Sequence, residues 1–173
     1  MRATNSTLAP CHPSPTGNGQ AETAQLPQRF RAWSKIQARH RDRMAKVYVR
    51  QSSPQQVKDH RESGDLQYEL VRLATDLGWS RDRVEVIDDD QGHTAASAEG
   101  RLGFQRLLAE VSLDHVGLIV GIEMSRLARS CKDWYQLLEA CSLFGTVLAD
   151  QDGVYDPSDY NDRLLLGLKR PPS

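Results

Sequence analysis

Short apolar runs alternate with longer amphipathic segments along most of this chain. Four of the short runs predict strands, at Lys46–Val49, Val84–Ile87, Gly117–Ile122 and Thr146–Ala149. Between them, apolar residues recur at helical spacing in Asp65–Leu77, Phe104–Val111 and Lys132–Phe144. This alternation predicts an α/β fold, a three-layer-like domain whose central, mostly parallel sheet is flanked by helices.

The two ends of the chain have a different pattern. Residues 1–28 are rich in Pro, Ser, Thr, Gly, Asn and Gln. They predict a disordered tail, because they can bury too little surface to offset the entropy of ordering. Residues 29–45 are dense in Arg, Lys and His, with Phe30, Trp33 and Ile36 at helical spacing. We expect a short basic helix there that packs on the domain rather than a DNA-binding arm. The domain proper is expected over 46–169, before a tail at 170–173.

Composition narrows the class of protein. With 22 Lys and Arg against 23 acidic residues, the chain lacks the overall charge of a nucleic-acid binder, so DNA contacts must be local or come from another domain. Cys11, Cys131 and Cys141 have no metal-binding spacing and favour a reducing, cytoplasmic setting over a disulfide framework. No apolar run approaches the roughly twenty residues that span a membrane, so no membrane partner is expected.

Polar clusters follow three of the predicted strands. Arg50 and Ser52 follow the first strand, Asp88–Thr94 the second and Ser125–Arg129 the third. Active groups in parallel α/β folds collect at the carboxyl ends of the strands. The three clusters are therefore expected to converge on one edge of the sheet.

The residue types in these clusters favour phosphoryl transfer over acyl transfer. Ser52 lacks a Gly-x-Ser-x-Gly elbow and an obvious His/Asp partner, so a catalytic triad is a poor explanation. Phosphoryl transfer instead develops charge on phosphate oxygens, which fixed guanidinium groups can stabilise. The chain offers Arg50, Arg101, Arg126 and Arg129, the last two expected on one face of a helical turn. The plainer alternative for that pair is a solvated, salt-bridged helix start.

Three motifs resemble those of a known family. Residues Tyr48–Ser52 read Tyr-Val-Arg-Gln-Ser, residues Asp90–Ala95 read Asp-Gln-Gly-His-Thr-Ala, and residues Arg126–Arg129 read Arg-Leu-Ala-Arg. In this order they resemble the Tyr-x-Arg-x-Ser, Asp-x-Gly-x-Ser-Gly and Arg-Leu-x-Arg motifs of the serine recombinases, the resolvase/invertase family. Arg101–Phe104 is similar to the family's Arg-x-Gly-Phe continuation. The second motif departs from the family, because threonine replaces its serine and alanine its final glycine.

The resemblance implies DNA strand cleavage and exchange through a 5′-phosphoserine intermediate, with no metal and no cofactor. Ser52 would attack the phosphate, Arg50 would contact it, and Arg126 and Arg129 would bind it and help to expel the 3′ oxygen. The implied partners are DNA and further copies of the chain, as dimers or tetramers, or intact recombinase relatives. A mobile-element origin and association with the nucleoid are also implied. The supporting residues would be Gln67, Asp90, Thr94, Arg101 and Ser125.

The end of the chain raises an alternative. Asn161–Lys169 resembles the start of the family's long oligomerisation helix, but Pro171 and Pro172 cannot continue a helix. Family members normally carry that helix onward to a DNA-binding domain. We therefore expect a truncated recombinase, and the alternative function is a non-catalytic module that pairs with intact relatives.

Acidic and imidazole groups leave a second alternative open. Asp88, Asp89 and Asp90 follow a strand, as in a magnesium-dependent receiver-like or phosphohydrolase domain. His93 and His115 are more typical of surface positions than of general bases. The acidic stretch at 152–162 lacks calcium-loop spacing and predicts a solvated turn.

Overall fold

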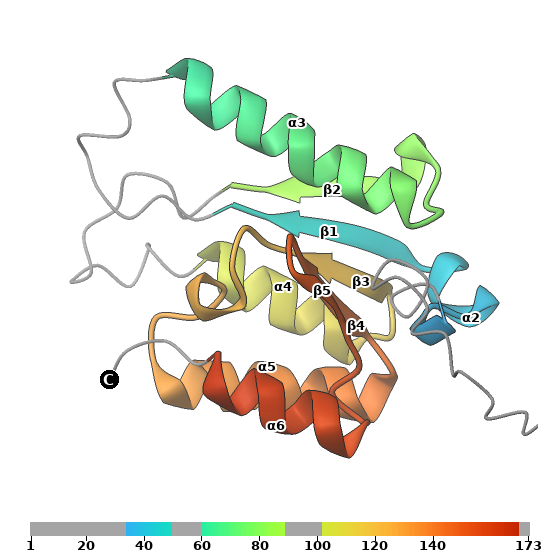
Figure 1. Cartoon of the computed structure of the whole chain (residues 1–173), viewed down its shortest axis with the longest axis vertical. Helices are drawn as coiled ribbons and strands as arrows, with labels where there is room; N and C mark the ends of the chain where they lie inside the picture. Colours follow the sequence, from blue (N-terminus) through green and yellow to red (C-terminus); the bar gives the residue numbers. More distant parts are fainter. Residues whose placement is uncertain (1–33, 50–59, 89–101, 170–173) are drawn as a thin grey trace, which may run out of the picture.

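A five-stranded sheet forms the centre of the molecule. The computed structural model describes residues 34–49, 60–88 and 102–169. Strand order is β2-β1-β3-β4-β5, with β1 parallel to β2 and β3, β3 parallel to β4, and β5 antiparallel to β4 (Figure 1). The predicted mostly parallel α/β fold is therefore confirmed. The strands are β1 (Met44–Tyr48), β2 (Val84–Ile87), β3 (Val116–Val120), β4 (Val147–Asp150) and β5 (Gly153–Tyr155).

Helices cover both faces of the sheet. In Figure 1, α3 (His60–Asp76) lies on one face, while α4 (Leu102–Ser112), α5 (Cys131–Phe144) and α6 (Tyr160–Leu168) lie on the other. Ser130 caps the start of α5, where its side chain accepts a hydrogen bond from the Asp133 amide, and Gly145 caps its end in the left-handed conformation. None of the described helices is long and apolar enough to cross a membrane.

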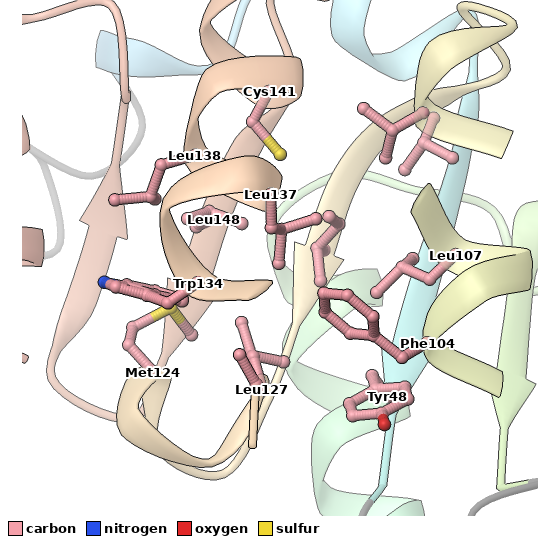
Figure 2. Close-up of a cluster of buried hydrophobic side chains, with 14 of the residues drawn as sticks. Tyr48, Phe104, Leu107, Met124, Leu127, Trp134, Leu137, Leu138, Cys141 and Leu148 are labelled. Atoms are coloured by element: carbon pink, nitrogen blue, oxygen red, sulfur yellow. The ribbon is translucent and has the colours of Figure 1, made fainter. Parts of the chain in front are cut away.

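Alternating strand residues divide the core into two clusters. Ala45 and Val47 of β1 pack in the cluster that includes Leu70 and Ala74 of α3. Tyr48 belongs to the opposite cluster, which Figure 2 shows between the sheet, α4 and α5. Period-two alternation along β1 therefore supplies both faces of the sheet. The α5 contribution comes at helical spacing, from Trp134, Leu137, Leu138 and Cys141.

The basic segment at 29–45, the lead-in, differs in its described part from the single helix predicted. Its described part contains the four-residue helix α2 (Ala38–Arg41), after a break at residues 36 and 37, and β1 starts by Met44. Ile36 and His40 are buried. A Cβ at Gly117 would lie 1.9 Å from the carbonyl oxygen of His40. The segment packs against the sheet, as expected, but its described part is not one continuous helix.

The acidic stretch is also more ordered than a solvated turn. Residues 153–155 form β5, which pairs with β4. Asp159 caps α6 by accepting hydrogen bonds from the amides of residues 161 and 162. Asp162 is only 5% exposed and is bonded to Lys35. These carboxylates bond to backbone amides and to a lysine. The predicted solvated turn is wrong because those partners are distant in sequence or come together only when the chain folds.

The strand order creates a place for a site. The chain passes from β1 through α3 to β2 on one side, then crosses β1 through α4 to β3 on the other. The direction of winding thus reverses between β1 and β3. In open α/β sheets, ligands bind outside the carboxyl ends of the strands at such a switch point.

Candidate functional site

A buried turn at the carboxyl end of β3 carries the candidate arginines. The chain leaves β3 through Gly121 and forms the 3₁₀ turn η4 (Met124–Arg126). Met124, Leu127 and Ala128 are buried in the cluster around Trp134, with Met124, Leu127 and Trp134 labelled in Figure 2. These buried side chains therefore fix the turn against the core.

The outward side of this turn is polar and connected. Arg126 Nε lies 3.3 Å from Glu123 Oε2, and the Ser125 hydroxyl lies 3.3 Å from the same oxygen. The Arg126 amide also donates to the Glu123 carbonyl at 3.0 Å. The Arg126 side chain is 46% exposed. Its charged group therefore remains accessible to an anion at the sheet edge.

Arg129 occupies a different setting from Arg126. The helical turn ends at Arg126, and Arg129 lies in the bend before Ser130, the residue that caps α5. The predicted helical face shared by the two arginines is therefore wrong. Arg129 is partly buried, whereas Arg126 is exposed. The buried neighbours Leu127 and Ala128 set the path between them.

The end of β1 lies beside the start of this turn. Val47 is in register with Val120 of β3, and Tyr48 with Ile87 of β2. The Val49 amide donates to the Ile87 carbonyl at 3.0 Å, which continues the pairing past β1. The carboxyl ends of β1, β2 and β3 are thus aligned. The predicted nucleophile Ser52 and its neighbour Arg50 lie outside the described residues, as do Asp90, Thr94 and Arg101.

The structure also describes Gln67 and Asp88, which the sequence singled out. Gln67 lies within α3 and is partly buried; no hydrogen bond joins it to η4 in the described part of the chain. Asp88 is exposed, and its neighbours Asp89 and Asp90 are outside the described residues. Across residues 34–49, 60–88 and 102–169, no three His, Cys, Asp or Glu side chains form a metal-binding group.

One buried acid, at the end of β4, was not among the residues predicted from the sequence. Asp150 is 4% exposed and accepts a hydrogen bond from Lys169 Nζ at 3.0 Å. Lys169 Nζ also contacts Asp152 at 2.6 Å and lies 4.9 Å from the ring centre of Tyr155. Burial is the main cause that raises the pKa of the Tyr155 hydroxyl. This cluster ties the end of α6 to the β4–β5 turn.

Glu123 is a further polar residue, just before η4, that lies outside the quoted motifs. The available signal was its position three residues before Arg126, a spacing at which side chains on one helical turn meet. The η4 geometry realises that contact. Sequence spacing predicts the pair but cannot tell which edge of the guanidinium the carboxylate meets.

Comparison with known proteins identifies the type of domain. The family model described as Resolvase, N terminal domain, matches residues 45–170. A curated protein of Sinorhizobium fredii, named "Uncharacterized protein y4bA/y4pH", is 50% identical over 135 residues. That match covers 78% of this chain but 20% of the relative. The chain therefore spans about a fifth of the length of this relative.

Solved structures share the fold. The N-terminal catalytic domain of TP901-1 integrase aligns with a TM-score of 0.54 at 20% identity, over 73% of this chain and 91% of that one. A resolvase family site-specific recombinase from Streptococcus pneumoniae aligns with a TM-score of 0.50 at 23% identity, over 73% and 84%. At these identities the likeness concerns the fold alone.

Proposed function

This chain belongs to the resolvase family of serine recombinases, and from that premise we propose that it is a catalytic domain for DNA strand cleavage and exchange. The observation that carries the proposal is the anchored arginine turn at the carboxyl end of β3, beside the end of β1. Arg126 offers an accessible guanidinium there, at the switch point where α/β sheets bind ligands.

The proposed reaction begins with in-line attack of the Ser52 hydroxyl on a DNA phosphate. A bond forms between the serine oxygen and phosphorus, and the bond from phosphorus to the 3′ oxygen breaks. The serine hydroxyl loses one proton and the departing 3′ oxygen gains one. Attack of a 3′ hydroxyl on the phosphoserine reverses these changes and releases the serine. The number of phosphoester bonds is conserved, so the exchange needs no external energy source.

Arg50, Arg126 and Arg129 would stabilise the charge that develops on the phosphate. Guanidinium groups suit this task because they remain protonated and make bidentate hydrogen bonds to phosphate oxygens. The buried anchor beneath η4 supports this role, since a fixed charge needs no reorganisation as the reaction proceeds. We assign Gln67, Asp90, Thr94, Arg101 and Ser125 supporting positions on the strength of the motif resemblance.

DNA and further copies of the chain are the proposed partners. Helix α6 corresponds to the predicted start of the oligomerisation helix, and Tyr160, Leu164 and Leu168 recur along it every four residues with most of their surface exposed. An exposed apolar stripe of this kind favours burial against another subunit. Dimers or tetramers of the domain would hold two DNA strands for exchange.

A covalent trapping assay tests the proposed function. The full chain, alone and fused to a heterologous DNA-binding domain, is incubated in EDTA with a suicide substrate carrying the matching binding site. We expect the fusion to give a protein–DNA adduct that survives denaturation and is absent from Ser52→Ala. The unfused chain separates catalysis from targeting, because phosphate contacts by the added domain supply most of the affinity.

Two other outcomes would replace the proposal. A folded fusion that binds DNA but forms no adduct would favour the non-catalytic module that pairs with intact recombinases. Cleavage that appears only with magnesium and leaves no adduct would favour the metal-dependent phosphohydrolase. Mixing the chain with an intact relative, and measuring inhibition of that relative, then tests the module directly.

A further inference from the structure

Four exposed arginines gather at the end of the sheet opposite the candidate site. Arg39 and Arg41 belong to α2 in the lead-in. Arg81 and Arg83 belong to the 3₁₀ turn η2 (Arg81–Arg83) between α3 and β2. In Figure 1, α2 and the connection from α3 to β2 both lie at the end of the sheet where the parallel strands begin. We call these four residues the amino-edge surface.

Hydrogen bonds hold the two halves of the amino-edge surface together. Arg83 Nη1 donates to the backbone carbonyls of Arg41 and Asp42, at 3.2 and 2.6 Å. The buried indole of Trp79 donates to the Arg43 carbonyl at 2.9 Å. The lead-in and the α3–β2 connection are therefore fixed against each other, so their arginines form one surface.

The arginines of this surface are not neutralised by ion pairs. Most of the lysine and arginine side chains that the structure describes bond to a carboxylate, as Arg163 bonds to Glu139. Within that part of the chain, the four arginines of the amino-edge surface make no ion pair. Arg81 and Arg83 bond to backbone carbonyls, which carry no net charge.

Nearby acids reduce this positive charge without cancelling it. Asp76 at the end of α3 and Asp114 after α4 are already paired with other arginines. The exposed Asp42 and Asp82 then stand against the four arginines, which leaves a net charge of +2. The whole chain has a net charge of −1. Positive charge is therefore concentrated at this end of the sheet.

Packing of the lead-in does not use up its arginines. Ile36 and His40 are buried against the domain, whereas Arg39 and Arg41 are exposed. The whole segment 29–45 contains five Arg and one Lys against the single acid Asp42. The lead-in therefore packs on the domain and still presents positive charge to solvent.

We propose that the amino-edge surface binds the phosphate backbone of DNA without reading its sequence. The inference rests on the proposed function, from which it takes DNA as the partner. Arginine suits this task because its planar guanidinium makes bidentate hydrogen bonds to phosphate and stays protonated at any working pH. Contacts of this kind supply affinity but carry no sequence information.

The surroundings of the arginines favour DNA over an acidic protein. Protein interfaces are built around an apolar core, whereas DNA interfaces are more polar and more positively charged. In the described stretches 34–43 and 79–83, no large apolar side chain is exposed. The amino-edge surface therefore offers charge without an apolar centre, as a phosphate backbone requires.

The amino-edge surface lies away from the scissile phosphate of the proposed reaction. It lies where β1 and β2 begin, whereas η4 follows the carboxyl end of β3. Strand β1 is five residues long, roughly 17 Å at the usual rise of a strand. A phosphate held by this surface and a phosphate at η4 would therefore belong to different stretches of DNA.

Salt-dependent DNA binding tests the inference. The full, unfused chain is titrated into a fluorescein-labelled duplex of arbitrary sequence, and Kd is measured by anisotropy between about 50 and 200 mM KCl. We expect Arg39→Gln/Arg41→Gln to raise Kd at least about tenfold at about 100 mM salt. The slope of log affinity against log salt should become shallower by about two, because each lost phosphate contact removes about 0.9.

A charge-matched variant provides the control. Arg106→Gln/Arg163→Gln removes two positive charges from exposed arginines that are paired with Glu85 and Glu139. We expect its Kd to stay within about threefold of the wild type, because those charges are already offset. Thermal unfolding of Arg39→Gln/Arg41→Gln should match the wild type, since both replaced residues are exposed and without ion pairs.

Three results would overturn the inference. The first is an unchanged Kd and salt slope in Arg39→Gln/Arg41→Gln. The second is an equal loss of affinity in the charge-matched variant, which would mean that net charge alone sets binding. The third is polyglutamate of equal charge that binds as tightly as the duplex and loses affinity equally in Arg39→Gln/Arg41→Gln, which would assign the surface to an acidic protein.

The covalent trapping assay keeps this inference separate from the proposed function. If the fusion forms the adduct while Arg39→Gln/Arg41→Gln binds the duplex like the wild type, the proposed function stands and the amino-edge surface falls. If the fusion forms no adduct while the duplex affinity depends on these arginines, cleavage falls and the DNA-binding surface stands.

Discussion

Lys35 and Asp162 join the lead-in to α6 across 127 residues of sequence, with Nζ and Oδ2 2.6 Å apart. Lys35 also donates to the Val154 carbonyl, and the Asp162 carboxylate accepts the Asp156 amide. The Asp162 side chain is 7% exposed and that of Lys35 32%. One buried carboxylate therefore connects the lead-in, the segment after β5 and α6.

Loss of Lys35 should destabilise the domain. Lys35→Met leaves the buried Asp162 carboxylate without its cation, and we expect a loss of about 1–3 kcal/mol in the free energy of unfolding, measured by urea denaturation. The control, Arg72→Met, breaks an exposed pair and should cost less than about 0.5 kcal/mol. Equal effects of the two variants would mean that Asp162 is not held by Lys35.

Replacement of either η4-region arginine should silence cleavage without unfolding the protein. We expect Arg126→Ala and Arg129→Ala to lower the rate of adduct formation by about 10²–10³, as loss of one preorganised charge typically does. Thermal unfolding should change little for Arg126→Ala, because its side chain is 46% exposed. Arg72→Ala, on the surface of α3, serves as the charge-matched control and should retain full cleavage.

Buried His40 should make stability depend on pH. Its Nδ1 accepts the Gln37 amide at 3.0 Å, and its Nε2 is buried with no hydrogen-bond partner among the residues that the structure describes. Burial, followed by the charges of Arg39 and Arg43, lowers the pKa of His40, while Asp156 opposes them. The unfolded chain therefore binds this proton at a higher pH than the folded domain does. Stability should fall as pH drops below about 6.5.

His40→Gln tests this dependence without removing the cap. Glutamine at this position of a helix can still accept the amide at the start of α2, but it does not titrate. Urea denaturation between pH 7.5 and 5.5 should give a flatter profile for His40→Gln than for the wild type. A slope unchanged in His40→Gln would contradict the assignment.

Loss of the Glu85 carboxylate and replacement of the buried Lys46 itself should change the stability of the domain by different amounts. Its side chain is 2% exposed, and its Nζ lies 2.6 Å from Glu85 and 3.7 Å from Glu110. The hydrogen bond from Lys46 is the main cause that lowers the pKa of Glu85. Because the pKa of Glu85 is lower in the folded domain than in the unfolded chain, the pair stabilises the domain at neutral pH. That stabilisation is lost as the pH falls through the folded-state pKa of Glu85.

We therefore expect Glu85→Gln to destabilise the domain more than Lys46→Met does. Glu85→Gln leaves a buried cation with a weaker partner and should cost about 2 kcal/mol. Lys46→Met replaces that cation by an apolar chain of similar length and should stay within about 1 kcal/mol of the wild type. Denaturation at pH 7 measures both, and NMR titration should show the pKa of Glu85 rising in Lys46→Met.

Much of the fold was predictable from local pattern. Period-two and helical spacing located β1 to β4 and α3 to α5, with ends that differ by a few residues because the ends of elements depend on partners. The strand β2 was predicted at its observed bounds. The three-residue β5 was missed, since its pairing with β4 rather than its own composition makes it a strand.

The candidate site was predictable only in part. The motif order placed Arg126 and Arg129 after β3, and the register of β1 with β3 brings the segment before Arg50 to the same edge. Helical spacing failed for these arginines because η4 ends after one turn. The edge of Arg126 that Glu123 meets depends on that turn and on the buried residues beneath it.

The sequence by itself determined the alternating elements, the order of the motifs and hence the family, because these depend on residue types and near-neighbour spacing. Only the tertiary structure decided that Lys46 and Asp162 are buried charges with partners, and that the lead-in is interrupted at residues 36 and 37. A charged side chain reads as exposed until distant segments bring an opposite charge and exclude water. That pairing is a property of the folded chain, so no local pattern contains it.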